Sequence, residues 1–257
     1  MPRIIAIANQ KGGVGKTTTA VNLAAALGVL GQKTLVVDAD PQANASSGLG
    51  CPKVKPSLYE VLLERATPEQ ALISTPYKNL YLLPASINLI GCELEFAFHS
   101  GKEHVLAKVI AQFGERFQYI FIDCPPSLGL LTVNALTAAQ AVLIPLQCEY
   151  YALEGLSLLI NTIKLVKKNF NPRLFIYGIL LTMYDARNRL TKQVEQEVRN
   201  HFKKAVFETV IPRNVRLSEA PSHGKPIFAY DATSRGARAY MTLAREVLKR
   251  EARLKKD

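Results

Sequence analysis

The stretch Lys11-Gly12-Gly13-Val14-Gly15-Lys16-Thr17-Thr18 decides how this 257-residue chain is organised. An apolar run at residues 4–8 precedes it and is typical of a buried parallel strand, and the alanine- and leucine-rich residues 20–27 that follow predict a helix. In a glycine-rich turn between a strand and a helix, backbone N–H groups can converge on phosphate oxygens. The stretch therefore predicts a phosphate-binding loop rather than a merely flexible turn. In such a loop the Lys16 ammonium reaches the β- and γ-phosphates, and the Thr17 hydroxyl binds Mg²⁺.

The loop departs from the general pattern G-x-x-x-x-G-K-[ST], because Gln10 stands where the first glycine belongs and Lys11 adds a second lysine. This K-G-G-x-G-K-T form resembles the deviant phosphate loop of the MinD/ParA ATPases. In that family the early lysine crosses a dimer interface to the partner's nucleotide. The resemblance implies that residues 11–18 bind ATP and that Lys11 and Lys16 both serve the reaction.

Carboxylates follow two further apolar strands. Residues 34–38 end in Asp38, with Asp40 two positions later, and residues 119–123 end in Asp123. The carboxyl ends of parallel strands share one edge of a sheet, so we expect these groups beside the phosphate loop. The resemblance implies that Asp40 positions and polarises the attacking water, and that Asp123 holds Mg²⁺ through a water. Asp38 is expected either to support Mg²⁺ through a water or to accept hydrogen bonds from the loop. The structural alternative is that Asp38 and Asp40 only cap the turn that follows the strand.

Charge is distributed unevenly along the chain. Residues 1–163 hold 11 lysines and arginines against 12 acids, whereas residues 164–257 hold 21 against nine, so the net charge of +11 lies in the last third. That asymmetry indicates a polyanionic partner, either nucleic acid or an anionic membrane surface, and the alternative is a solvated basic face that keeps the protein soluble. No secretory signal or membrane-spanning run is visible, so a cytoplasmic location is expected. The four cysteines form no C-x-x-C pair, which predicts free thiols.

Strand-like and helix-like segments alternate along the chain. This predicts an α/β fold with a doubly wound, mostly parallel sheet and helices on both faces, as a single domain over residues 1–257. Further strands are expected at 80–84, 141–146, 174–182 and 206–211. Helices are expected at 57–63, 88–98, 105–117, 130–139, 185–204, 215–220 and 234–249, and one is expected to end near Lys168.

The basic third carries the residues that we expect to contact DNA. Basic side chains with few aromatic residues among them suit phosphate contacts rather than base stacking, and no recognition-helix or zinc-finger motif is present. We therefore expect binding to double-stranded DNA without sequence preference. The expected contacts are Arg189 and Arg216, followed by Arg187, Arg199, Lys203 and Arg235. The last helix also has an apolar stripe, which could grip a membrane but more simply packs on the sheet.

Motifs distributed over the whole chain resemble those of chromosomal ParA/Soj-type partition ATPases. They are residues 11–18, 38–42, 119–127, 181–187 and 210–226. The resemblance implies an ATP sandwich dimer that binds DNA on the nucleoid and hydrolyses ATP slowly, with Mg²⁺, to ADP and phosphate. It also implies a ParB/Spo0J-type centromere-binding partner that stimulates hydrolysis. The loop formed by Pro212, Arg213 and Asn214 is implied to close over the adenine.

Three other functions are considered. A MinD-like ATPase for division-site placement would bind membranes, whereas here no stable membrane association is expected. A metabolic P-loop enzyme would need acceptor-binding residues that the sequence does not display. An iron–sulfur relative would need paired cysteines at the dimer axis, and Cys124 and Cys148 do not form that pattern.

Overall fold

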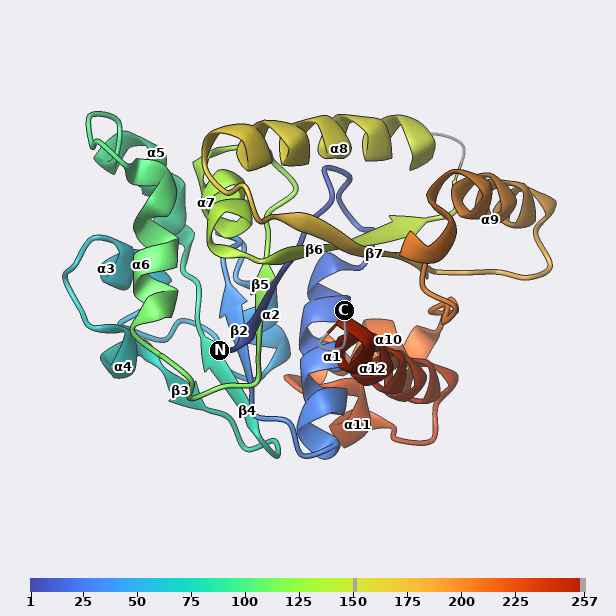
Figure 1. Ribbon diagram of the computed structural model, residues 1–257. Coiled ribbons are helices and arrows are strands. Elements are labelled where there is room, and N and C mark those ends of the chain that lie inside the picture. The colour runs from blue at the N-terminus through green and yellow to red at the C-terminus, as the bar shows by residue number, and fades with distance from the viewer. Residues whose placement is uncertain (150–151, 255–257) are drawn as a thin grey trace.

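A seven-stranded sheet runs through the middle of the protein in the computed structural model, which describes residues 1–149 and 152–254 (Figure 1). The strand order is β3-β4-β2-β5-β1-β6-β7, and every pairing is parallel except that of β3 with β4. The strands are β1 (Arg3–Ile7), β2 (Thr34–Asp38), β3 (Ile73–Ser74), β4 (Leu80–Leu83), β5 (Tyr119–Asp123), β6 (Ala141–Gln147) and β7 (Phe175–Thr182). The predicted fold class is confirmed.

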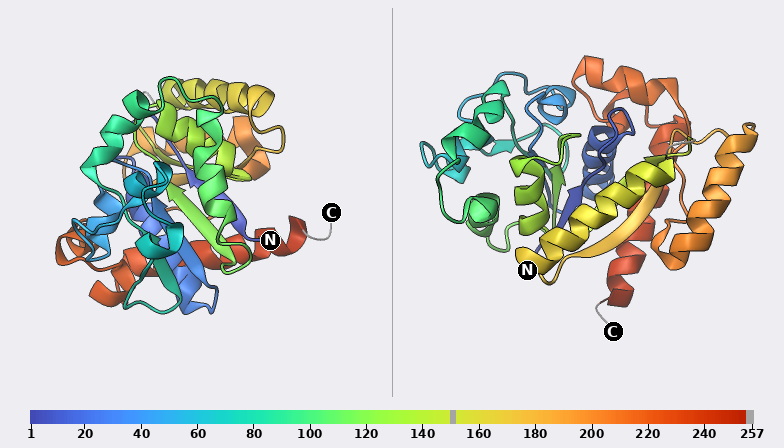
Figure 2. Two further views of the ribbon diagram at one scale, coloured as in Figure 1. Left: turned by 90° about the vertical axis from the view of Figure 1, so that its left-hand side faces the viewer. Right: turned by 90° about the horizontal axis from the view of Figure 1, so that it is seen from above.

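Helices cover both faces of the sheet (Figure 2). The longer ones are α1 (Lys16–Val29), α6 (Val105–Ala111), α7 (Leu130–Ala138), α8 (Ala152–Asn169), α9 (Arg189–Phe202) and α12 (Arg235–Leu254). Short helices are α2 (Asn44–Gly48), α3 (Leu58–Leu62), α4 (Pro68–Ala71), α5 (Cys92–Glu95), α10 (Val215–Glu219) and α11 (Ile227–Tyr230), and 3₁₀ turns are η1 (Ile87–Gly91), η2 (Lys102–His104), η3 (Lys203–Ala205) and η4 (Ala220–His223). One apolar core joins the sheet to α3, α6, α7 and α8, and a second joins its other face to α1, α11 and α12.

Strand β1 lies at the centre of the sheet, between β5 and β6. Strands β2, β4 and β5 therefore lie on one side of β1, and β6 and β7 lie on the other. Such a reversal of strand order opens a crevice at the carboxyl ends of the strands, where α/β proteins bind ligands. The loop at residues 11–18 follows β1 directly and therefore lies at this crevice.

The predicted strand at residues 206–211 is wrong. Only single parallel bridges pair Val206 with Ile179 and Pro212 with Tyr184. Between them the N–H groups of Glu208 and Thr209 donate to the Glu246 carboxylate on α12, each at 2.9 Å. A side chain from a distant helix thus takes the amides that a strand would have used.

Two predicted helices are shorter or less regular than expected. The helix expected over 105–117 ends at Ala111, and Gly114 in the following turn has a φ of +54°. The segment expected to be helical over 88–98 begins with η1, continues as α5 and ends in a turn at residues 96–98. The short antiparallel strand β3 was not predicted, because two residues give no periodic pattern.

Helix α1 connects the phosphate loop to the C-terminal part of the chain. The Thr19 hydroxyl lies 3.2 Å from the Tyr240 hydroxyl of α12, and the Asn22 side-chain oxygen accepts a hydrogen bond from the N–H of Ile227 at 2.7 Å. The apolar side of α12, including Leu243 and Val247, is fully buried, mainly against α1. Across the described residues, no helix combines the length and apolar character that a membrane crossing requires.

Candidate nucleotide site

The phosphate loop is held open by glycines and by a contact from β7. Gly13 and Gly15 have φ values of +74° and +86°, which side chains with a Cβ rarely adopt. The Thr182 hydroxyl, at the end of β7, donates to the Val14 carbonyl at 2.8 Å. Lys16 begins α1, so the loop amides and the positive end of this helix face the same space.

The ends of β1, β2 and β5 bring the predicted carboxylates to this loop. Asp38 is in register with Asp123 across the β2–β5 pair, and Asp123 is in register with Ile7 of β1. Both carboxylates are completely buried, and Asp40 and Lys16 are nearly so. The sheet register thus gathers Lys16, Asp38, Asp40 and Asp123 at one edge.

Asp38 is fully engaged by the protein. Its carboxylate accepts hydrogen bonds from the N–H of Asp40 at 3.3 Å and from the N–H and hydroxyl of Ser46 at 2.8 and 2.7 Å. Burial raises the pKa of Asp38 to about 6, although these hydrogen bonds favour the charged form. Of its two expected roles, the geometry favours binding the loop that carries Asp40.

Asp123 is the opposite case. Neither carboxylate oxygen has a hydrogen-bond partner among the described residues, although both are buried. Burial raises the pKa of Asp123 well above its usual range, and the Asp38 carboxylate raises it further, while the Thr17 hydroxyl and the Lys16 ammonium act against this shift. A buried carboxylate without partners is costly unless a cation or water completes its environment. The Asp123 carboxylate oxygens and the nearby Thr17 hydroxyl therefore fit Mg²⁺, which prefers oxygen ligands and retains part of its water shell.

Asp40 and Lys16 face the same region. One Asp40 oxygen accepts from the N–H of Gln42 at 3.0 Å, and the other makes no hydrogen bond to the described residues. The Lys16 ammonium donates to the Lys11 carbonyl at 3.2 Å. Burial lowers the pKa of Lys16, while the Asp123 and Asp40 carboxylates act in the opposite direction.

The Lys11 ammonium forms an ion pair with Glu149, just beyond β6. Both side chains are roughly half exposed. The Lys11 backbone is also fixed, because its N–H donates to the Asn9 side-chain oxygen at 3.0 Å, and the Asn9 amide donates to the Pro145 carbonyl at 2.7 Å. The loop backbone is therefore firmly held, while the ion pair that the Lys11 ammonium makes with the described residues is a half-exposed surface contact.

Pro212, Arg213 and Asn214 extend the edge of the sheet beside the loop. The N–H of Arg213 donates to the Tyr184 carbonyl at 3.2 Å, which aligns this segment with the chain that leaves β7. Together with Gly15, Thr18 and residues of α10, the three residues line a cavity of about 550 Å³. The Asn214 side chain also caps α10 by accepting from the N–H of Leu217 at 3.3 Å.

Comparison with known proteins identifies the family. Residues 2–176 match the family model described as "AAA domain". The chain is 55% identical over 249 residues to the sporulation initiation inhibitor protein Soj of Bacillus subtilis, covering 96% of this chain and 98% of that protein. It is 54% identical over 251 residues to the chromosome partitioning protein ParA of Myxococcus xanthus, covering 97% and 89%.

This chain belongs to the ParA/Soj family of chromosome-partition ATPases. Among solved structures, cobyrinic acid a,c-diamide synthase from Mycobacterium smegmatis with bound ADP and magnesium is 39% identical with a TM-score of 0.85, covering 97% of this chain and 95% of that chain. The cell division ATPase MinD of Pyrococcus furiosus is 31% identical with a TM-score of 0.79, covering 97% and 99%. The predicted family is confirmed, and so is the predicted cofactor class of ATP with Mg²⁺, because related structures hold ADP or an ATP analogue with magnesium.

The six predicted DNA contacts fall into two groups. Arg187, Arg199 and Arg216 form ion pairs with Asp185, Glu195 and Glu219 at 2.8 to 2.9 Å. Arg189, Lys203 and Arg235 are exposed and form no ion pair with the described residues. The basic Lys255 and Lys256 at the end of the chain lie outside the described residues.

Sequence reasoning missed several residues that shape this site. Thr182 stands at the carboxyl end of a strand, and the rule that such ends carry functional groups could have singled it out. Ser46 and Glu149 lie in segments without a motif, and only tertiary contact shows what they do. The cysteines are free as predicted, with Cys92, Cys124 and Cys148 buried.

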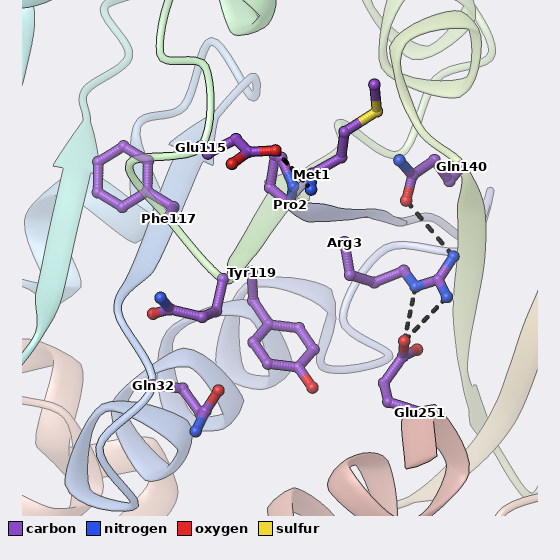
Figure 3. Close-up of a pocket in the computed structure, with 10 residues that line it drawn as sticks. Met1, Pro2, Arg3, Gln32, Glu115, Phe117, Tyr119, Gln140 and Glu251 are labelled. Atoms are coloured by element: carbon purple, nitrogen blue, oxygen red, sulfur yellow. Dashed lines mark hydrogen bonds and ion pairs between the residues drawn. The ribbon is translucent and has the colours of Figure 1, made fainter. Parts of the chain in front are cut away.

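A separate cavity of about 420 Å³ lies at the opposite edge of the sheet, where β1 begins (Figure 3). Arg3 lies between Gln140 and Glu251 and donates to them at 3.4 and 2.9 Å. These bonds join the first strand to the end of α12. The cavity lies away from residues 11–18, and we assign it a structural role.

Proposed function

We propose that this protein is an ATP-dependent dimerising switch for chromosome partition. ATP held between two protomers forms a sandwich dimer, the dimer binds double-stranded DNA of the nucleoid without sequence preference, and hydrolysis to ADP and phosphate releases it. Slow, Mg²⁺-dependent turnover is stimulated by a ParB/Spo0J-type centromere-binding partner. One observation carries the proposal: in a chain of this family, the buried Asp123 carboxylate lies beside Lys16 and Thr17 at the end of the phosphate loop and has no hydrogen-bond partner in the described part of the chain.

Each residue at the crevice has a distinct role in this proposal. The loop amides and Lys16 bind and orient the phosphates, and the cavity beside Pro212 to Asn214 receives the adenine. Thr17 and Asp123 hold Mg²⁺, Asp123 through a water, and the metal supplies charge neutralisation at the phosphates. Asp40 has a carboxylate oxygen that makes no hydrogen bond to the described residues, and this oxygen would orient and polarise the attacking water. Asp38 keeps the Asp40 segment in place through Ser46.

Dimerisation depends on nucleotide for an electrostatic reason. In the dimer, Lys11 of one protomer approaches the phosphates bound by its partner, close to the partner subunit's Lys16. Two ammonium groups repel unless the phosphates between them neutralise their charge. The Lys11 side chain is only loosely held by Glu149, so it can be redirected when the partner arrives.

The DNA-binding surface is proposed on the basic third. A groove of about 830 Å³ lies between η3 and the end of α12. Among the groove residues, Arg199 and Arg250 are paired with Glu195 and Glu246, whereas Lys203, Lys204, Lys249 and Arg253 form no ion pair with the described residues. Together with Arg189 and Arg235, these free cations offer phosphate contacts, and a dimer doubles their number and hence the counterion-release term.

Membrane binding of the MinD type is disfavoured by the packing of α12. A helix that lies on a membrane must expose its apolar side. Here Tyr240, Leu243, Ala244 and Val247 are buried, and Leu254 is the exposed large apolar residue of the described part of α12. The apolar face is thus already used to pack on α1.

The proposal is tested by size-exclusion chromatography with and without ATP, followed by a shift assay on non-specific duplex DNA at two salt concentrations. We expect ATP to produce a dimer, and the dimer alone to shift DNA, more weakly at high salt. Asp40→Ala should trap the ATP-bound dimer on DNA. Normal turnover by Asp40→Ala would refute the catalytic assignment, and flotation with anionic liposomes in place of a DNA shift would favour the membrane function.

A further inference from the structure

Met183, directly after β7, has a backbone conformation that residues with a Cβ rarely adopt. Its φ is +48°, in the left-handed region that glycine and asparagine occupy more readily. Of the non-glycine residues with positive φ in the described part of the chain, Met183 is the one that lines the cavity of about 550 Å³ beside the phosphate loop. Strain of this kind persists only where the surrounding structure enforces it, and it is concentrated at functional sites.

The residues on either side of Met183 are hydrogen-bonded to different parts of the nucleotide site. The Thr182 hydroxyl donates to the Val14 carbonyl in the phosphate loop at 2.8 Å. The N–H and the carbonyl of Tyr184 both form hydrogen bonds with the backbone of residues 211–213, at 3.0 and 3.2 Å. These bonds enforce the conformation of the strained residue, which lies between an attachment to the loop and an attachment to the segment beside the cavity.

The cavity that Met183 lines suits a flat apolar ring. Apolar side chains form much of the rest of its wall, and they are those of Ile211, Pro212, Val215 and Leu217. Met183 itself is half-buried, so part of its surface is available to a ligand. Pockets for small molecules are lined mostly by apolar groups, and a methionine sulfur makes favourable contacts with aromatic rings. This wall therefore fits a purine base better than it fits phosphates.

We propose that the Met183 side chain packs against the adenine ring of ATP, and that its strained backbone fixes this contact at a set distance from the phosphate loop. The proposal deepens the function proposed above and rests on its placement of the adenine. The two attachments on either side of Met183 hold the base-binding and phosphate-binding parts of the site in a fixed relation. The strain is the free-energy cost of holding both ends of one ATP molecule in that arrangement.

The contact with the base is tested by comparing Met183→Ala and Met183→Gly with the wild type. Binding of ATP with Mg²⁺ is measured by isothermal titration calorimetry on the full-length protein. We expect both variants to bind ATP about tenfold more weakly, because an apolar contact is lost, and Met183→Leu to retain most of the affinity. Inorganic tripolyphosphate, which has the phosphates but no base, should bind equally to all four proteins.

The strain is tested by thermal melts of the nucleotide-free proteins. Both variants lack the side chain, but only alanine keeps the Cβ that crowds the backbone. Met183→Gly should therefore melt roughly 2–4 °C above Met183→Ala, the reverse of the usual order. The matched control is Glu64, an exposed residue with a φ of +57° that does not line the cavity. Glu64→Gly should also melt above Glu64→Ala, and both should bind ATP as the wild type does.

Wild-type affinity for ATP in Met183→Ala and Met183→Gly would overturn the contact with the base. An equal loss of tripolyphosphate binding would also overturn it, because the substitution would then act on the phosphate loop. A lower melting temperature for Met183→Gly than for Met183→Ala would refute the strain. If Met183→Ala does not fold by circular dichroism, Met183→Gly and Met183→Leu provide the comparison of affinities.

ATP-dependent dimerisation and the DNA shift are measured on the same wild-type samples. If both are absent while the Met183 variants lose affinity for ATP but not for tripolyphosphate, the proposed function fails and the role of Met183 stands. If both are present while the Met183 variants bind ATP like the wild type, the proposed function stands and the role of Met183 fails.

Discussion

The crevice at the strand ends and the basic third use charge in opposite ways. In the crevice, the Asp123 carboxylate is buried without a hydrogen-bond partner among the described residues, and Lys16 is buried beside it, so both charges are available to a bound ligand. In the basic third, several arginines are already neutralised by carboxylates of the same chain. A cluster of charged residues in a sequence therefore says less about binding than the number of charges left without an internal partner.

Lys16→Ala should have the largest effect, because it removes the buried cation on which the crevice depends. We expect ATP-dependent dimerisation and ATP-dependent DNA binding to fall by a hundredfold or more, in the range found when one preorganised donor is lost. Analytical ultracentrifugation with ATP and a DNA shift assay measure both. Arg235→Ala, at an exposed cation, is the control, and an equal loss in that variant would contradict the contrast between the two regions.

Asp123→Asn should reduce ATP turnover by roughly 10- to 100-fold, as expected when a residue that orients a metal's water is lost.

The same change should alter the pH dependence of the free energy of unfolding. The raised pKa values of Asp38, about 6 instead of 3.8, and of Asp123 mean that the folded protein binds more protons than the unfolded chain in this window. The free energy of unfolding therefore falls as the pH rises from about 4 through 6, and Asp123→Asn should weaken that fall.

Thermal melts of the nucleotide-free protein across this pH range check the prediction. The melting temperature of Asp123→Asn relative to wild type should increase with pH. Parallel curves for the two proteins would show that the Asp123 carboxylate is not a source of the pH dependence.

Arg189→Glu and Arg187→Glu compare an arginine that forms no ion pair with the described residues and a neighbour that is paired with Asp185. Arg189→Glu should weaken DNA binding at low salt about tenfold and reduce the salt slope by about two, one contact from each protomer, while ATP binding is unchanged. Arg187→Glu should have a smaller effect, because Arg187 already donates to Asp185 and lowers the pKa of that carboxyl group to about 2. Equal effects on the dissociation constant would show that internal pairing does not decide which arginines bind DNA.

Glu149→Gln should have the smallest effect. It releases Lys11 from its ion pair, and an exposed pair of this kind contributes little, so we expect dimerisation at a protein concentration lower by about threefold at fixed ATP. Light scattering across a protein titration measures the midpoint. A higher midpoint would mean that Glu149 instead presents Lys11 to the partner.

The sequence predicted those parts that local pattern determines. The phosphate loop and the strands ending in Asp38 and Asp123 were predicted correctly, because an apolar run followed by glycines or by an aspartate is typical of a buried strand that ends at a binding site. The strand expected at residues 206–211 failed because the Glu246 carboxylate on α12 takes two of its amides. The Lys11–Glu149 pair and the contacts of Ser46 with Asp38 and Ala85 depend on how separate segments come together, so no local pattern predicts them. The paired arginines lie only two to four residues from their carboxylates, and this local spacing could have predicted those pairs.

The bonds from α1 to the C-terminal part of the chain have a practical consequence for experiments. Thr19 and Asn22, one turn or so beyond the phosphate loop, are hydrogen-bonded to Tyr240 and to the backbone of Ile227. A truncation that removes α12 would strip the apolar side of the very helix that begins with Lys16. Such a deletion would yield a damaged protein rather than an ATPase lacking DNA affinity, so separation-of-function alleles must be sought among single exposed side chains.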